Sequence, residues 1–557
     1  MSAFVAELLR GDGPVRATGV NAPRERSWIV GHLRLDGRDD LRDALGAAGT
    51  ATPNDASDAD LALAAWNTWR ETATERLMGD YSFAIWDQRD RTLFCARDPL
   101  GVRPLYWAEA GRAFVCGNVL EDVRAHPLVS ARLHEPAIVS FLTHGFNDDT
   151  STTTFAGVRR LPPAHQLIVR GESGAIVPRR YWSFPVPAAL VLRRDEEYVE
   201  RFREIVGLAV RDRLRGGRAA ILLSGGLDSA TLATTARRVA PSVALTAWTN
   251  DMGASQPADE LRLAAEVAQR IGAPHHVVRN TAAPLGHLAA PGFHTPEPLD
   301  EPEWGSWIAQ LRAIAAQAQI LISGEDGDAL FRPPGLMTML RTRPLVEVAS
   351  SVLRYTMLHR RQPHLGVWLR HGMRSPLKPR RVRVPRWVRG DVCLRAGHRA
   401  TAPLPEHPAR PDAVRSLGDS VWQSVLEQSQ PACTGVPLET VWPLLDVRLM
   451  EFVFSIPPVP WCQRKELMRR ALTGAVSDEV VTRAKAPLSG YSEALVERWR
   501  AANAGSAPRF GQAIREFVDT HAVTDTLQRG SVWEVLPAWR ALILDRWLQS
   551  VERERVS

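Results

Sequence analysis

Lysine is the scarcest charged residue in this chain of 557 residues, because only Lys378, Lys465 and Lys485 stand among its 69 basic residues. No Gly-Lys dipeptide occurs, and this excludes a Walker A phosphate loop. The five cysteines are scattered and form no C-x-x-C pair, which argues against both a disulfide framework and a zinc site. We expect the cysteines to be reduced and packed.

Long apolar runs are lacking as well, since no stretch approaches the roughly 20 residues of a membrane span. Residues 1–10 contain no basic stretch leading into an apolar one, so neither a signal peptide nor an anchor is indicated. Hydrophobic residues make up 45% and charged residues 24% of the chain, as in ordinary globular proteins. We expect a cytoplasmic protein of about two to four domains, with no membrane contact.

The positive charge is concentrated in one segment. Residues 341–399 carry fifteen Arg or Lys and two acids, a net charge of +13, so the rest of the chain sums to −6 against a total of +7. We interpret this basic variable segment as a surface for an acidic peptide or partner, with a plain solvated surface as the alternative.

The first part of the chain reads as short strands and turns. Residues 79–87 alternate at the strand period, and residues 92–96 follow after a polar turn, which predicts an antiparallel hairpin. Residues 97–106 add a turn and another strand. A Pro-rich stretch at 183–187 predicts the end of this domain.

The pattern then changes to strand, turn, helix, strand. Asp195 is a candidate cap for a helix, and residues 219–223 and 243–249 are apolar on either side of a helical stretch at 229–239. This alternation predicts a parallel sheet with helices on its faces. Ligands bind such sheets where the strands end and the helices begin.

The hexapeptide at 224–229, Ser-Gly-Gly-Leu-Asp-Ser, lies at such a point. Gly225 and Gly226 allow close approach of backbone N–H groups, and the following helix directs its positive end at the turn. The loop is therefore suited to pyrophosphate, and Asp228 is suited to a Mg²⁺ ion that bridges the phosphates. A simple Gly/Ser-rich helix cap is the alternative.

This loop resembles the pyrophosphate loop of the ATP-pyrophosphatase family, which cleaves ATP to AMP and pyrophosphate. Residues 321–331 (LISGEDGDALF) resemble the second signature of asparagine synthetases and their relatives. Three shorter stretches also match that subfamily, namely Asp259-Glu260, residues 300–302 (DEP) and residues 442–446 (WPLLD).

The resemblance implies roles for individual residues. Asp228 and Asp328 would bind Mg²⁺, and Glu325 would lie beside the reacting carbonyl, where it or a neighbour would accept the amine proton. ATP would contact Leu223, Ser224, Gly225, Gly226, Asp228, Ser229, Ser323 and Gly324.

Two of the three lysines fall at the lysine positions of this family. Lys and Arg differ where a compact charge is needed, so the retention of Lys in an Arg-rich chain suggests chemistry. We predict that Lys485 stabilises the oxyanion when an amine attacks the acyl-adenylate, and that Lys465 contacts phosphate. For Lys378 we expect only a solvated surface.

The N-terminal domain resembles the glutaminase half of asparagine synthetase through residues 79–87 and 97–106. A glutaminase of this kind needs a Cys exposed by removal of Met1, and here position 2 is Ser. The amine must then come from the substrate or a second molecule. We expect a degenerate, Ntn-type αββα glutaminase-like domain at 1–185, followed at 195–557 by a parallel-sheet α/β ATP-pyrophosphatase (adenine nucleotide α-hydrolase-like) domain.

Among relatives without the nucleophile, the chain looks most like lasso-peptide macrolactam synthetases. That resemblance implies a ribosomal precursor peptide as substrate, with a leader peptidase and a leader-recognition protein as further partners. The alternative is a beta-lactam synthetase or another amide ligase that acts on a small molecule. The beta-lactam synthetases, however, resemble each other in carrying Tyr at the position where this chain has Glu325.

A tRNA-directed adenylating enzyme is a further alternative, because the basic segment mixes Arg with Tyr355, Trp368 and Trp387. The glutaminase-like domain, which such enzymes lack, argues against nucleic acid.

Overall fold

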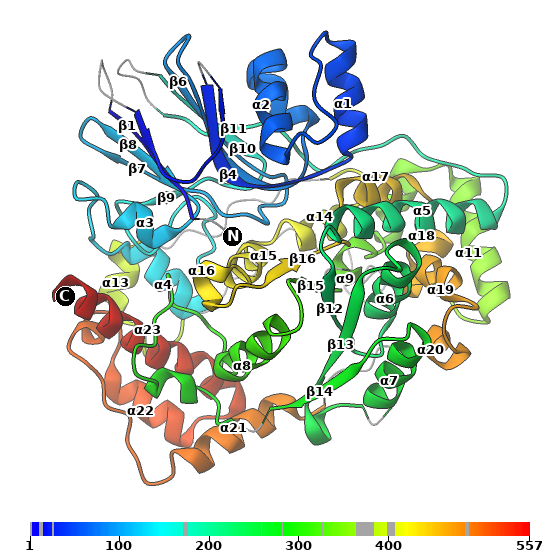
Figure 1. The fold of residues 1–557 in the computed structure, drawn as a ribbon. Coiled ribbons are helices and arrows are strands. Elements are labelled where there is room, and N and C mark those ends of the chain that lie inside the picture. Colours follow the sequence, from blue (N-terminus) through cyan, green and yellow to red (C-terminus); the bar gives the residue numbers. More distant parts are fainter. Residues whose placement is uncertain are drawn as a thin grey trace.

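The structure is a computed structural model, and it describes residues 3–9, 15–24, 27–170, 176–257, 259–280, 282–325, 327–363, 384–397, 407–484 and 489–556. Figure 1 shows two facing antiparallel sheets in the N-terminal part (residues 3–182) and a separate parallel sheet in the C-terminal part (residues 195–556). The long helices near the C-terminus lie beneath the N-terminal sheets in this view.

The N-terminal part has four layers. One sheet has the strand order β2-β1-β8-β7-β9 and the other β11-β10-β6-β5-β4-β3. The strands are β1 (Val5–Leu9), β2 (Val15–Ala17), β3 (Val20–Arg24), β4 (Ser27–Asp36), β5 (Met78–Asp87), β6 (Thr92–Arg97), β7 (Tyr106–Ala110), β8 (Ala113–Gly117), β9 (Arg159–Arg160), β10 (His165–Arg170) and β11 (Arg179–Arg180). The helices are α1 (Arg38–Ala47), α2 (Asp58–Trp69), η1 (Arg70–Arg76), α3 (Leu120–Arg124) and α4 (Glu135–His144).

Apolar side chains explain this layering. Alternate residues of both sheets, such as Trp86 and Trp107, share one buried core between the sheets. The outer face of one sheet packs against α1 and α2, and that of the other against α3 and α4. The predicted αββα architecture is confirmed, as is the hairpin, in which Asp87 of β5 pairs with Thr92 of β6.

The C-terminal part contains a sheet in the order β14-β13-β12-β15-β16, with every neighbouring pair parallel. Its strands are β12 (Arg218–Leu222), β13 (Ala244–Asp251), β14 (His275–Arg279), β15 (Ile320–Ile322) and β16 (Glu439–Val441). The helices that cover it are α5 (Asp195–Arg213), α6 (Leu227–Val239), α7 (Glu260–Arg270) and α8 (Trp304–Ala315).

Successive residues of β12 point to opposite faces, so Ala219 and Ile221 pack with α5, α6 and α7 while Ala220 packs with α8. The predicted parallel sheet with helices on both faces is confirmed. The prediction for Asp195 was wrong by one residue, since Arg194 is the cap and Asp195 is the first helical residue. Its carboxylate instead pairs with Arg354 at 2.9 Å and Arg470 at 2.8 Å.

The remaining described elements are mostly helices. They are η2 (Gly253–Ser255), η3 (Gly286–Ala289), α9 (Gly327–Leu330), α10 (Leu336–Thr342), α11 (Leu345–His359), α13 (Gly390–Arg395), α14 (Pro411–Leu417), α15 (Ser420–Gln428), α16 (Pro431–Thr434), α17 (Val447–Ser455), α18 (Pro458–Trp461), η4 (Gln463–Lys465), α19 (Glu466–Leu472), α20 (Asp478–Thr482), α21 (Tyr491–Ala502), η5 (Ala513–Glu516), α22 (Thr520–Arg529) and α23 (Val532–Val556). None of the helices within the described ranges is long and apolar enough to cross a membrane.

The five cysteines are free, and Cys95, Cys116 and Cys462 are buried. In the basic segment the structure describes α11 and α13. Lys378 and the rest of 364–383 lie outside the described residues.

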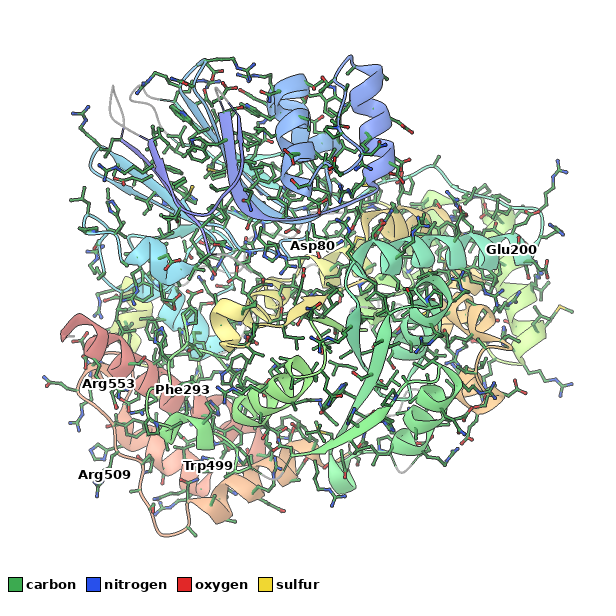
Figure 2. The ribbon with its side chains drawn as sticks, in the orientation of Figure 1. Asp80, Glu200, Phe293, Trp499, Arg509 and Arg553 are labelled. Carbon is green, nitrogen blue, oxygen red and sulfur yellow. The ribbon has the colours of Figure 1, made fainter. Side chains whose placement is uncertain are left out.

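Buried ion pairs join the N-terminal and C-terminal parts. Arg97 and Arg160 of the first part contact Glu427 of the second at 3.2 and 3.0 Å, and Arg160 also pairs with Glu297. We call these four residues the ion-pair layer. Asp80, labelled at this junction in Figure 2, belongs to a second buried cluster, in which Arg213 reaches across from α5.

Candidate active site

The loop after β12 is shaped by close backbone packing. Gly225 has a φ of +62°, and a Cβ there would lie 2.8 Å from the backbone oxygen of Glu260, so only glycine fits. Ser229 Oγ lies 3.3 Å from both the backbone nitrogen and the hydroxyl of Ser224. Leu223 continues the sheet by donating its N–H to Trp248 O at 2.8 Å. The sequence pattern thus folds into a strand, a turn and a helix, and the turn is tied internally.

A second loop follows β15 and packs directly on the first. Ser323 donates its N–H to Val441 O at 3.0 Å and is 2% exposed. A Cβ on Gly324 would lie 3.2 Å from Ser229 N, and one on Gly327 would lie 2.6 Å from the carboxyl carbon of Asp228. Two strands that are neighbours in the sheet therefore bring together loops that are about a hundred residues apart in the sequence.

Lys465 lies between the two predicted metal ligands. Its Nζ is 2.5 Å from Asp228 Oδ2 and 2.5 Å from Asp328 Oδ1, and its side chain is 12% exposed. Arg464 and Lys465 both have left-handed backbones, with φ of 49° and 57°. Two such non-glycine residues cost about 1–2 kcal/mol each, and conformations of this kind concentrate at functional sites.

The donor set around Lys465 suits Mg²⁺. Two carboxylates converge on a point that already accommodates positive charge, and Mg²⁺ prefers hard oxygen ligands. No cluster of three or more His, Cys, Asp or Glu side chains suited to a metal occurs in the described part of the chain. Such a site fits an ion that takes its other ligands from phosphates and water. The metal roles of Asp228 and Asp328 remain predictions.

Glu325 occupies the second loop at the edge of this centre. Glu325 is exposed to solvent, while the protein packed around it raises the pKa of its carboxyl. Burial also raises the pKa of Glu301, and the charges of Glu303, Asp300 and Glu325 raise it further. The charge of Glu325 thus contributes to the raised pKa of Glu301, and a carboxylate with a raised pKa is a better proton acceptor.

Lys485 lies outside the described residues, so its predicted role stays a prediction. Arg483, which sequence reasoning did not single out, is described and connects three elements. It lies 3.4 Å from Ser224 O, 3.2 Å from Asp259 and 3.5 Å from Glu260. The acidic pair Asp259-Glu260, already noted in the sequence, was the signal that a basic partner was needed.

Glu303 was also missed, although it directly follows the DEP stretch. It accepts hydrogen bonds from Tyr491 and Arg498 of α21, and from Asn280 at 2.5 Å. These contacts hold the segment containing Glu301 against the C-terminal helices. Nothing local in the sequence pointed to this role, since its partners are up to about 200 residues away.

The fold and this site define a class of protein: an αββα amidotransferase-type domain followed by a nucleotide-binding parallel sheet with a pyrophosphate loop. Residues 201–549 match the family model "Asparagine synthase", and residues 28–182 match "Glutamine amidotransferase domain". The chain belongs to the asparagine synthetase family. Members of this family are ATP-dependent ligases that form carbon–nitrogen bonds through AMP intermediates.

Similar proteins include asparagine synthetase [glutamine-hydrolyzing] 3 of Bacillus subtilis, which is 24% identical over 490 residues, or 82% of this chain and 75% of that protein. A putative asparagine synthetase [glutamine-hydrolyzing] of Mycobacterium tuberculosis is 30% identical over 313 residues, which are 54% of this chain and 46% of that one. Amidase chry2 of Gibberella zeae is 26% identical over 293 residues, which are 49% and 43% of the two chains. The chain therefore spans less than half of the last two relatives.

Proposed function

We propose that this protein closes a macrolactam ring in a precursor peptide. ATP adenylates an Asp or Glu side chain of the peptide, and the peptide's own N-terminal amine attacks that acyl-adenylate. An isopeptide bond forms, and pyrophosphate and AMP are released in turn. The observation that carries the proposal is the convergence of Asp228, Asp328 and Lys465, in a chain that has Ser at position 2.

The ion-pair layer lies where the N-terminal and C-terminal parts meet. A ligase fed by glutamine hydrolysis would need a path for ammonia from the N-terminal to the C-terminal part. Between these parts lie the side chains of Arg97 and Arg160, which are 0% and 3% exposed and contact Glu427. These ion pairs fix part of the junction, and a pocket lined by Arg160, Glu297 and Glu427 lies beside them.

Each residue has a definable task in this scheme. The loop at 224–229 would bind the phosphates, and Lys465, the residue just before the start of α19, would contact them. Mg²⁺ bound by Asp228 and Asp328 would neutralise charge on the leaving pyrophosphate. Glu325 would accept the proton released when the amine attacks, and Lys485 would stabilise the oxyanion, a contribution of about 3–4 kcal/mol by analogy with oxyanion donors.

Holding the amine and the acid of one peptide together accounts for much of the rate. Proximity of this kind supplies about 7–11 kcal/mol in well-oriented intramolecular reactions. The proposed partners are the ribosomal precursor peptide, a leader peptidase and a leader-recognition protein, and the proposed location is the cytoplasm.

The experiment combines the enzyme, Mg-ATP and linear peptides that have a free N-terminus and one internal Asp or Glu. We expect a product lighter by one water, and AMP in equal amount. An Asp328→Asn variant is the control, and it should form neither. Formation of ADP, or a product that gains nitrogen from added glutamine, would refute the proposal.

A further inference from the structure

The turn that presents Lys465 has an unfavourable backbone conformation. Arg464 and Lys465 follow one another with positive φ, and neither is a glycine or an asparagine. Lys465 also stands just before the first residue of α19, so the direction of its side chain depends on how this helix begins. A conformation of this kind persists only where the surrounding structure imposes it. The residues that impose it here lie in α19 and at the end of α20.

Arg469 of α19 holds this turn through backbone carbonyl groups. Its guanidinium donates hydrogen bonds to Arg464 O at 2.8 Å, to Arg483 O at 2.9 Å and to Val481 O. A guanidinium presents several N–H groups in a fixed planar arrangement, so one side chain can bond three carbonyl oxygens at once. The compact ammonium of a lysine cannot span them. Arg469 therefore joins the turn before α19 to the end of α20 and the residue that follows it.

Arg483 continues this connection to the loop at 224–229. Its side chain is 13% exposed and lies 3.4 Å from Ser224 O, at the start of that loop. It also lies 3.2 Å from Asp259 and 3.5 Å from Glu260, where α7 begins. α19 packs against α20 and α6, and α6 packs against α7, so these contacts lie on one side of the parallel sheet (Figure 1). One path of hydrogen bonds thus leads from the turn before α19 to the loop.

The contacts of Arg469 do not depend on the partners of the Lys465 amine. In this structure Nζ lies 2.5 Å from Asp228 and 2.5 Å from Asp328. In the proposed function Nζ exchanges these carboxylates for phosphate oxygens. The hydrogen bonds of Arg469 go to backbone carbonyl groups and involve neither carboxylate, so they are independent of this exchange. Arg469 is therefore placed to keep the turn fixed while the amine changes partners.

We propose that Arg469 is a positioning residue that fixes Lys465 against the phosphates of ATP, with Arg483 as its link to the loop at 224–229. This inference rests on the phosphate contact of Lys465 in the proposed function, and it adds the residues that hold the amine in place. Arg469 acts through the Arg464 carbonyl group and not by touching ATP. Its replacement should therefore weaken ATP binding only as long as Lys465 is present.

The test measures the dissociation constant of Mg-ATP by isothermal titration calorimetry, with no peptide present. The variants are Arg469→Gln, Lys465→Met and the double variant, and thermal melting confirms that each is folded. Arg203→Gln is the matched control. Arg203 of α5 also donates to a backbone carbonyl of α19, that of Ala471 at 2.8 and 3.0 Å, but near the opposite end of the helix. If Arg469→Gln does not fold, Arg469→Lys is a milder change with the same expected direction, because an ammonium cannot bond all three carbonyl oxygens.

We expect Lys465→Met to weaken Mg-ATP binding by about 10- to 100-fold, as for the loss of one charged hydrogen bond. Arg469→Gln should weaken it by about 10-fold. The double variant should bind no more weakly than Lys465→Met, because both changes remove the same contact. Arg203→Gln should bind Mg-ATP as wild type does.

Three results overturn the assignment of Arg469 alone. They are wild-type binding by folded Arg469→Gln, losses that add up in the double variant, and a loss in Arg203→Gln equal to that in Arg469→Gln. Wild-type binding by Lys465→Met has a wider consequence, because it overturns the phosphate contact of Lys465 on which the proposed function also depends.

Discussion

Gly327 offers the sharpest test of the convergence of the two loops. A Cβ added there would lie 2.6 Å from the carboxyl carbon of Asp228. Carbon atoms in ordinary contact are about 3.5 Å apart, so the Asp228 carboxylate must move by roughly 1 Å in a Gly327→Ala variant. Gly327 begins the short helix α9, where helix propensity by itself favours alanine.

A displacement of this size in a catalytic group costs about 100-fold in rate. That factor corresponds to about 2.7 kcal/mol of lost transition-state stabilisation. We therefore expect Gly327→Ala to fold normally but to exchange pyrophosphate into ATP about 100 times more slowly than wild type, in the presence of a peptide that the enzyme closes. Circular dichroism and thermal melting would confirm that the fold is intact.

Gly390→Ala is the matched control. Gly390 also begins a short helix, α13, and a Cβ there would meet no atom within 4 Å. Its exchange rate should equal that of wild type. If Gly327→Ala keeps a wild-type rate with an unchanged melting temperature, Asp228 does not act where the structure places it, and the proposed metal and phosphate roles fail.

Three further predictions follow from individual residues. Lys465→Arg should lose AMP formation as fully as Lys465→Met, because the larger planar guanidinium does not fit between two carboxylates that each lie 2.5 Å from Nζ. The measurement is AMP release, and an active Lys465→Arg variant would contradict this prediction. The ring-closure rate should fall as the pH drops through the pKa of Glu325, which is raised above the ordinary value of about 4.3, because only the carboxylate form accepts a proton. If the Glu325→Gln variant shows the same fall in rate at low pH, Glu325 is not the proton acceptor. Arg160→Met should destabilise the protein by about 3–5 kcal/mol in chemical denaturation, because Glu297 loses its charged partner and Glu427 keeps only Arg97. Arg395→Met at the surface should change stability little, and equal effects of the two variants would show that the ion-pair layer adds nothing.

Local chemistry in the sequence was sufficient to predict the nucleotide loop. Apolar residues followed by Ser-Gly-Gly and then a helical pattern leave few alternatives, and β12 and α6 were predicted within one or two residues of their bounds. The cap at Asp195 was misplaced by one position because an acid in the first helical turn is favoured by the helix dipole whether or not it caps.

Contacts between distant segments could not be read from the residues alone. Asp228 and Asp328 meet because β12 and β15 are neighbours in the sheet, and only the resemblance to asparagine synthetases indicated that order. The position of Lys465 depends on two left-handed residues for which the sequence has no glycine or asparagine as a signal. Arg160 and Glu427 are separated by more than 250 residues, and charge pairs at such distances have no local pattern.

The ion-pair layer joins the N-terminal and C-terminal parts of the molecule. Buried ion pairs add little stability compared with packed apolar residues, so stability alone is a weak reason for their presence. Their geometry points to a positioning role instead. Arg160, engaged by Glu297 and Glu427, ties β9 of the N-terminal part to two segments of the C-terminal part. Replacing Arg160 by a residue too mild to unfold the protein should therefore loosen the junction of the two parts before it lowers the stability of either core.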